Sequence, residues 1–274
     1  MNNEFADEQW SWHINEVIHY TTELTTWETQ RVNSYLATKY GITLDQSVPQ
    51  DYLSSNSTVY WSGIANSGYA NNITSIGRDD TSVLMQKQSK SVNASGLVTV
   101  WLWQIASTNE LNTGAFGADR SYLTFWDNNG ALAWITTWAY RMLSRVFKAQ
   151  EVWVVGTGRF QVPNSTSSLP TKLPSHSGLV MMLVDGDGDF STWVTAYNWV
   201  LSGTDWVFDA DLSNGQYFSF ASADGSLLLW IKADAGVVLS WSTVSQWNDQ
   251  WGQGNNLLQT SGDREPTIIN SGIN

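Results

Sequence analysis

Short runs of alternating or β-branched apolar residues recur along most of the chain, and Gly, Asn, Asp or Ser lies between them. Such runs are typical of β-strands, and the polar clusters are typical of turns. Many short strands that recur about every ten residues favour an antiparallel sandwich. We therefore expect an all-β protein, an antiparallel β-sandwich or jelly-roll-like fold, with strands at Thr58–Ser62, Ile73–Gly77, Ser82–Gln88, Leu97–Ile105, Tyr122–Asp127, Trp134–Trp138, Leu143–Val155, Gly178–Val184, Trp193–Leu201, Trp206–Asp211 and Gln216–Ala221.

One stretch near the N-terminus has the pattern of a helix. Thr25 and Glu28 form a capping-box pattern, which predicts a helix over about residues 26–39. Gly41 is the expected left-handed stop, and the expected apolar stripe is Val32, Leu36 and Tyr40. The preceding run, Ile14–Tyr20, alternates and predicts a strand, whereas Asp45–Thr58 has the composition of a loop.

The most distinctive chemistry lies in LVDGDGDFSTW, residues 183–193, where Asp185, Asp187 and Asp189 alternate with glycines. Alternate carboxylates on a glycine-rich turn can converge on one hard cation, and calcium prefers such oxygen ligands. An EF-hand loop would carry Gly and Glu where this chain has Phe190 and Ala196. A turn without metal explains the same residues. The sequence therefore predicts a calcium site and leaves the metal-free turn open.

Composition narrows the classes of partner. The chain has 274 residues, a formal net charge of −12 and a pI of about 4.4, so nucleic acid and anionic membrane are poor partners. The absence of cysteine excludes disulfides and thiolate chemistry. No apolar run is long enough to span a membrane, and MNNEFADEQW lacks the features of a signal peptide. We expect a soluble protein without membrane insertion.

Tryptophan is unusually frequent, with 17 residues. An indole has a large apolar face and one N–H donor, so it suits both a packed core and a stacking platform for sugar rings. Most of these tryptophans lie within strand-like runs, which favours the core for most of them.

No catalytic constellation is evident. Nucleophilic catalysis needs a nucleophile with a base, and the chain has no Cys, no GxSxG and only three His. Glycoside hydrolysis needs two facing carboxylates, for which Glu16, Glu28, Glu110 and Glu151 are candidates only by residue type. The run Arg78-Asp79-Asp80 is better explained as a turn with a salt bridge than as a second cation site. We therefore predict no catalytic residues.

Three stretches resemble known families. Glu16–Asp45 resembles the closing strand and terminal helix of laminin-G-like, concanavalin-type jelly rolls of bacterial surface proteins. The middle, about Val59–Ala221, resembles a domain of unknown function that commonly follows such jelly rolls. The tail of the chain, Leu227–Asn256, resembles the opening of another laminin-G-like jelly roll. The matching middle motifs are NNITSIGRDD, LMQKQSKSVN, FGADRSYLTFWDNNG, SRVFKAQEVWVVGTG and LVDGDGDFS. The chain departs from this pattern where it carries Trp101, Trp103 and Trp153.

The resemblance implies three parts. Residues 1–45 are the end of a jelly roll, residues 46–222 are a β-sandwich domain with the Asp-rich loop, and residues 223–274 are the start of a jelly roll, which includes a strand at Leu227–Lys232. The flanks are short for a complete jelly roll. They belong to a tandem array, pair with each other, or pair with a neighbouring molecule by strand addition.

The resemblance favours a non-enzymatic extracellular or cell-surface module for adhesion or structure. We expect calcium at Asp185, Asp187 and Asp189, and as partners a glycan or neighbouring surface-protein domains. Two alternatives remain open. One is a carbohydrate-active enzyme on a concanavalin-type fold. The other is a filament subunit that self-associates by strand exchange through its terminal segments.

Overall fold

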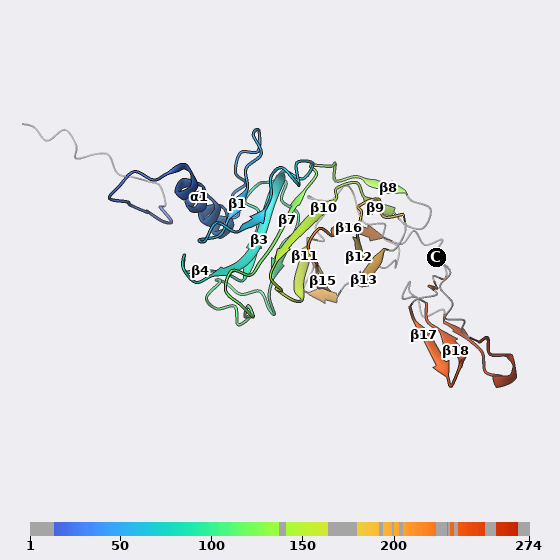
Figure 1. Ribbon diagram of the computed structural model, residues 1–274. Coiled ribbons are helices and arrows are strands. Elements are labelled where there is room, and N and C mark those ends of the chain that lie inside the picture. The colour runs from blue at the N-terminus through green and yellow to red at the C-terminus, as the bar shows by residue number, and fades with distance from the viewer. Residues whose placement is uncertain are drawn as a thin grey trace, which may run out of the picture.

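The computed structural model describes residues 14–136, 141–163, 180–191, 194–198, 200–202, 205–222, 229, 231–232, 235–249 and 256–267. Strands dominate this part of the chain, and α1 (Thr26–Tyr40) is the α-helix found in it (Figure 1). The predicted all-β class is confirmed. Among the described residues, no helix combines the length and the apolar character that crossing a membrane requires.

The larger sheet has nine strands, and all of their pairings are antiparallel. Its main path runs, in spatial order, through β13 (Thr195–Asn198), β12 (Val180–Asp185), β16 (Tyr217–Ser222), β10 (Phe147–Val152), β7 (Tyr122–Asp127), β3 (Asn71–Asp79) and β4 (Leu84–Gln86). Two further strands, β9 (Arg141–Leu143) and its partner β8 (Trp134–Thr136), join at β16. Every residue of β7 and β12 is buried, as expected of strands that are covered on both faces.

A second sheet packs against this one and completes the sandwich. Its order is β14 (Val200–Ser202), β15 (Asp205–Ala210), β11 (Gly158–Val162), β6 (Thr99–Trp101) and β5 (Gln88–Lys90). The core between the sheets is rich in phenylalanine. Phe160 of the second sheet lies 5.9 Å from Phe125 and 5.7 Å from Phe218 of the first, between ring centroids. Burying each such ring stabilises the fold by roughly 1.5–3 kcal/mol.

The other face of the larger sheet is covered near β3 and β7 by α1 and by the small sheet of β1 (Tyr52–Leu53) and β2 (Val59–Trp61). Successive strand residues point to opposite faces, so Tyr122 and Trp126 face this layer while Phe125 faces the sandwich core. Tyr60 stacks on Tyr122 at 4.0 Å, and Trp61 stacks on Trp126 at 5.2 Å. An aromatic layer therefore joins α1 and β2 to the sheet.

The helix begins and ends where the sequence predicts. Thr25 is the N-cap of a complete capping box with Glu28, and Gly41 adopts the left-handed conformation with φ 63°. The predicted apolar stripe of Val32, Leu36 and Tyr40 is wrong, because these residues are only partly buried. The fully buried face consists of the small residues Ser34, Ala37 and Thr38, which allow the helix to approach the aromatic layer closely.

The predicted strand at Ile14–Tyr20 is wrong. These residues have no β-pairing, and we call residues 14–24 the arm. Ile14, Val17 and Tyr20 are exposed. Alternation alone does not make a strand, because its backbone groups need a neighbouring strand to bond.

Other boundaries differ in smaller ways. Leu143–Val155 divides at a bend before β10, and Trp193–Leu201 divides into β13 and β14, which belong to different sheets. The predicted loop Asp45–Thr58 contains the short strand β1, and β11 lies just after the predicted strand Leu143–Val155, in a stretch where no strand was expected. Several parts of the chain that were interpreted from the sequence lie wholly or partly outside the described residues. They are residues 1–13 and parts of the predicted strands Trp134–Trp138, Gly178–Val184, Trp193–Leu201 and Leu227–Lys232.

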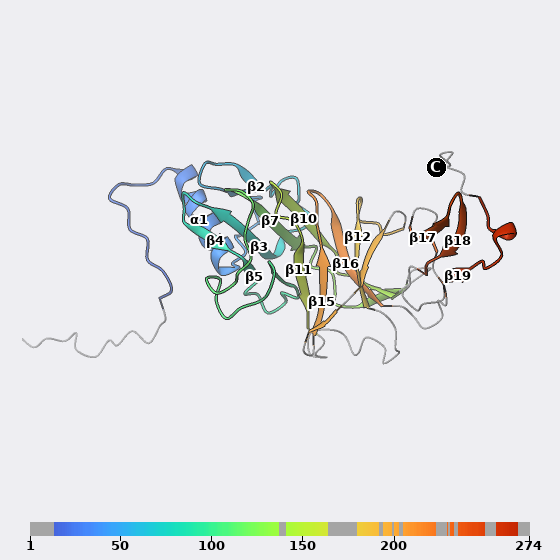
Figure 2. The same ribbon diagram turned by 90° about the horizontal axis from the view of Figure 1, so that it is seen from below.

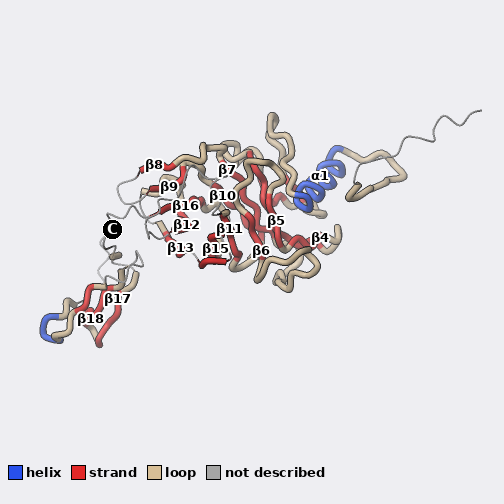
Figure 3. The backbone as a smooth tube through the Cα atoms, turned by 180° about the vertical axis from the view of Figure 1, so that it is seen from behind, coloured by secondary structure: helices blue, strands red, loops and turns tan. Residues whose placement is uncertain are grey.

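A small antiparallel sheet lies at the opposite end of the molecule from α1 (Figure 2 and Figure 3). It consists of β17 (Val237–Ser240), β18 (Thr243–Trp247) and β19 (Leu257–Leu258), and a 3-10 turn, η1 (Gly262–Arg264), follows. Leu239, Leu257 and Leu258 of this sheet are exposed. The arm and this sheet lie at opposite ends of the molecule in both views. Self-association through the terminal segments stays a prediction.

Candidate functional site

The aspartate loop, residues 185–191, begins at the last residue of β12. Oδ2 of Asp185 accepts hydrogen bonds from the backbone N–H groups of Gly188 (2.7 Å) and Phe190 (3.2 Å), which curl the loop around this carboxylate. Gly188 has φ 87°, and a Cβ there would lie 2.9 Å from the ring of Tyr217. The loop therefore requires glycine at this position both for its backbone and for space.

The three predicted metal ligands are brought together. One carboxylate oxygen from each of Asp185, Asp187 and Asp189 lies within 4.8 Å of the others, and Asp185 is buried while the other two are exposed. The N–H of Asp189 lowers the pKa of Asp187, but the adjacent Asp185 carboxylate outweighs it, so the pKa of Asp187 is raised. Burial raises the pKa of Asp185, but hydrogen bonds from Asp187, Phe190 and Gly188 lower it overall.

Carboxylates in such proximity are stable when they share a proton or a cation. An all-oxygen set of carboxylates fits the preference of calcium, and Asp185, Asp187 and Asp189 are the residues that would hold it. Asp187 and Asp189 also accept from backbone N–H groups two residues further on, at 3.0 and 2.7 Å. These are the bonds of ordinary aspartate turns, so the metal-free alternative accounts for them equally well.

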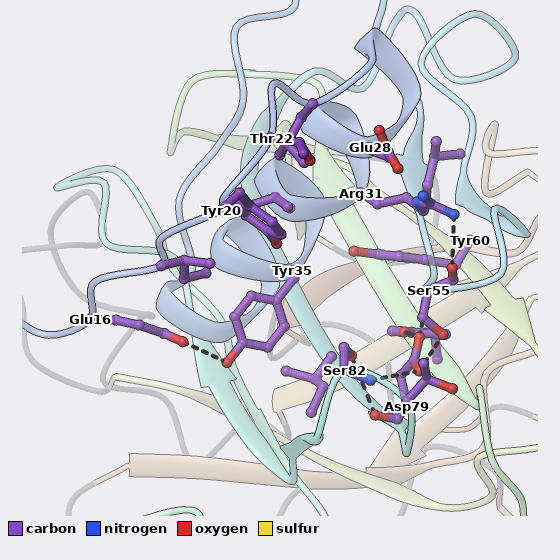
Figure 4. Close-up of a pocket in the computed structure, with 17 residues that line it drawn as sticks. Glu16, Tyr20, Thr22, Glu28, Arg31, Tyr35, Ser55, Tyr60, Asp79 and Ser82 are labelled. Carbon is purple, nitrogen blue, oxygen red and sulfur yellow. Dashed lines mark hydrogen bonds between the residues drawn. The ribbon is translucent and has the colours of Figure 1, made fainter.

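A second feature is a cavity of about 510 Å³ between the arm, α1 and the ends of β3 and β4 (Figure 4). Alternate arm residues and one face of the helix line it on one side. Residues around Ser55, Asp79 and Tyr122 line the other side. The arm is held at one end by Glu16, whose carboxylate accepts from Tyr35, Lys39 and Tyr40 at 2.9 to 3.0 Å, and at the other end by the capping box.

Each carboxylate in this cavity already has donors. Asp79 is completely buried and accepts from the N–H and hydroxyl of Ser55, both at 2.7 Å, and from the Tyr122 hydroxyl at 3.0 Å. Burial raises the pKa of Asp79, but these hydrogen bonds together lower it. The pKa values of Glu16 and Glu28 are also lowered, by hydrogen bonds from Lys39 and from Thr25 respectively, although burial acts against this at Glu16. At neutral pH all three are therefore ionised acceptors.

Asp79 is a residue whose position the sequence did not reveal. The predicted turn salt bridge forms between its neighbours Arg78 and Asp80, with a nitrogen–oxygen distance of 2.7 Å. Asp79 itself points inward, because successive residues at the end of β3 face opposite sides. Alternation was the one sequence signal for this difference. Extending it two residues beyond the predicted strand Ile73–Gly77 assigns Asp79 to the buried face and Asp80 to the exposed one.

The tryptophans divide more evenly than predicted. Among the described ones, Trp61, Trp101, Trp126 and Trp206 are buried, whereas four others are exposed at 64% to 99%: Trp27, Trp103, Trp153 and Trp241. Trp103 lines a shallow pocket of about 310 Å³ with Leu102, Thr113, Gly114, Ala115, Val155 and Thr157. Trp134 and Trp247 are partly buried, and Trp134 packs against the core. The prediction that most tryptophans belong to the core is therefore wrong for the four exposed ones.

Comparisons with the curated proteins and with the solved structures give no match. A family model described as domain of unknown function (DUF8202) matches residues 28–216. The matched region starts in α1 and ends just before β16, so it contains the aspartate loop, the cavity residues on the sheet and the pocket at Trp103. Since the match covers well over half of the chain, this protein belongs to the DUF8202 family.

Proposed function

We propose that this protein is a non-enzymatic adhesion or structural module of an extracellular bacterial surface protein, stabilised by calcium and able to bind glycan. The observation that carries the proposal is the aspartate loop, where Asp185, Asp187 and Asp189 gather three carboxylates at the end of a buried strand. A cation there would hold the chain between β12 and the following residues in one conformation.

The states of the three carboxylates in the cavity beside the arm support the non-enzymatic part. A glycosidase needs one carboxylic acid with a raised pKa and a second carboxylate facing it across a cleft. In the cavity beside the arm, the pKa values of Glu16, Glu28 and Asp79 are all lowered. These residues serve the structure as clamp, helix cap and buried acceptor.

The calcium proposal predicts a metal-dependent stability. A ligand that binds only the folded state raises the free energy of unfolding by roughly 2.7 kcal/mol at a hundredfold excess over Kd. We expect thermal melts in millimolar calcium to show a higher Tm than melts in EDTA. Asp187→Asn should abolish this difference, and Asp263→Asn, an exposed aspartate in η1, should preserve it.

Superimposable melts in calcium and EDTA would refute the calcium site and reduce the aspartate loop to an ordinary turn. A Tm increase in calcium that persists in Asp187→Asn, but that a substitution of another acidic residue abolishes, would place the ion at that other residue.

One observation favours the alternative of a carbohydrate-active enzyme. Glu151 is half-buried at the end of β10, and its pKa is raised by burial and by the nearby charge of Asp211, although the N–H of Val155 opposes this. A reducing-end assay on neutral polysaccharides decides between the two. We expect no release of reducing ends, whereas release that Glu151→Gln abolishes would establish the enzyme.

A further inference from the structure

We infer that Trp103 and Trp153 form a stacking platform for neutral pyranose rings of a glycan, with the pocket at Trp103 as its central subsite. This inference rests on the proposed adhesion function and assigns its glycan site. Trp103 is 71% exposed and Trp153 is 68% exposed, although the chain buries Trp101 two positions before Trp103. An indole left in water in this way retains a large apolar face for a ligand.

The topology places the two tryptophans at the same end of the sandwich. Trp103 follows β6, which pairs with β11 so that Trp101 lies opposite Arg159. The residues that precede Arg159 therefore run alongside Trp103, and Val155 and Thr157 line its pocket. Trp153 lies in the same β10–β11 connection, two residues before Val155.

Both tryptophans hold a backbone conformation that their side chains do not favour. Trp103 has φ 60° and Trp153 has φ 55°, in the left-handed region where residues with a Cβ are strained. Strained residues of this kind cluster at binding sites, where the surrounding structure holds them. Here that support comes from β6 and β10, each paired with strands on both sides.

Hydrogen bonds and close packing also hold the lining of the pocket in place before a ligand binds. The N–H of Gly114 donates to Oδ1 of Asn112 at 2.8 Å, and a Cβ on Gly114 would lie 2.6 Å from Cβ of Leu102. On the opposite side, the N–H of Val155 donates to Oε1 of Glu151 at 2.7 Å. A ligand would therefore meet a site that needs little ordering, which favours binding by a shallow surface.

The chemistry of the lining selects the class of ligand. The seven lining residues carry no charge, so a charged ligand would find no partner among them. The acidic residues Glu151 and Asp211 nearby, with the net charge of −12, disfavour uronates and sialylated glycans. Thr113 and Thr157 offer hydroxyl groups, and Trp103 offers an apolar face. A neutral pyranose matches this set, because it presents hydroxyls at its edge and C–H groups on its face.

The size of the pocket suits a small ligand group. A pocket of about 310 Å³ is at the small end of the range for ligand pockets, roughly 300–1,000 Å³. One sugar ring of a glycan would occupy it, and the neighbouring rings would lie across the exposed indoles.

The test is binding of the full chain to soluble neutral polysaccharides (xyloglucan, galactomannan and a β-1,3-glucan) and to polygalacturonate, by affinity electrophoresis and isothermal titration calorimetry. We expect binding to at least one neutral polysaccharide and none to polygalacturonate. Trp103→Ala should weaken the affinity for that polysaccharide on the order of tenfold, because losing one stacked aromatic contact lowers an affinity by about that factor. Trp153→Ala should weaken it as well.

Trp27→Ala is the matched control, because Trp27 is exposed on α1 outside the pocket. Trp103→Gly is a second variant that removes the indole but accepts the left-handed backbone, so a loss of binding with an unchanged or higher Tm cannot be attributed to misfolding. Failure of every neutral polysaccharide to bind, or an equal loss in Trp27→Ala and Trp103→Ala, would overturn the inference.

The outcomes are independent of the calcium test. A calcium-dependent Tm without glycan binding leaves the proposed module standing and removes the platform. Glycan binding that persists in EDTA and in Asp187→Asn supports the platform even where the calcium site fails.

Discussion

At the scale of the residue, three of the four exposed tryptophans share a backbone conformation that residue type does not indicate. Trp103, Trp153 and Trp241 have φ of 60°, 55° and 62°, and all three are exposed, while the buried tryptophans of the described chain lie in strands or next to them. The sequence marks these residues only as tryptophan. Each of these three stands in a left-handed turn, and no local pattern predicted those turns.

Relieving this strain should stabilise the fold. The left-handed conformation costs a residue with a Cβ roughly 1–2 kcal/mol, and Gly loses about 0.5–1 kcal/mol of backbone entropy in exchange. We expect Trp103→Gly to raise the free energy of unfolding by up to about 1 kcal/mol. Urea denaturation measures this. Trp103→Ala is the control, because it keeps the strain, and a gain of the same size in that variant would contradict the explanation.

At the scale of the element, the arm illustrates how one carboxylate with several donors can hold the start of a segment that has no secondary structure. Glu16 is the residue through which the start of the arm contacts α1, with the Lys39 ammonium 3.0 Å from its carboxylate. The helix provides a fixed partner because its capping box and Gly41 define its ends. Both helix signals could be recognised in the sequence, whereas the contact of Glu16 with Lys39, 23 positions away, could not.

The attachment of the arm should depend on pH. Burial raises the pKa of Glu16, but hydrogen bonds from Lys39, Tyr40 and Tyr35 lower it overall. Because the folded pKa lies below the ordinary value of 4.5, the contribution of Glu16 is present at neutral pH and disappears as pH falls through the lowered value.

Limited proteolysis within arm residues 17–24 should therefore accelerate at acid pH, after correction for the activity of the protease at each pH. Glu16→Gln should show the same acceleration already at pH 7. Equal protection of the arm in this variant and in the unmodified protein would show that Glu16 does not hold it.

At the scale of the whole molecule, the two sheets share one core. Phe160 of the second sheet is completely buried against phenylalanines of the first. We expect Phe160→Ala to destabilise the sandwich by about 3–5 kcal/mol. Near- and far-ultraviolet circular dichroism should report one shifted transition, because neither sheet keeps its core alone. Trp241→Ala, at a side chain that is 99% exposed, should shift the transition little. Separate transitions in Phe160→Ala would mean that the sheets fold independently.

Features that depend on neighbouring residues could be predicted from the amino-acid pattern. Alternation predicted most strands, Thr25, Glu28 and Gly41 predicted the helix and its ends, and the spacing of Asp185, Asp187 and Asp189 predicted that their carboxylates converge. Each signal lies within a few residues, so local sterics and hydrogen bonding suffice to produce it.

Which strands pair, and therefore which side chains are exposed, depends on the tertiary fold. It placed β13 and β14 in different sheets, turned Asp79 into the interior and left the arm without a strand partner. It also left Trp103 in water at a pocket that residues of the β6–β7 and β10–β11 connections line together. These outcomes depend on contacts between residues far apart in the chain, and local periodicity carries no information about such contacts.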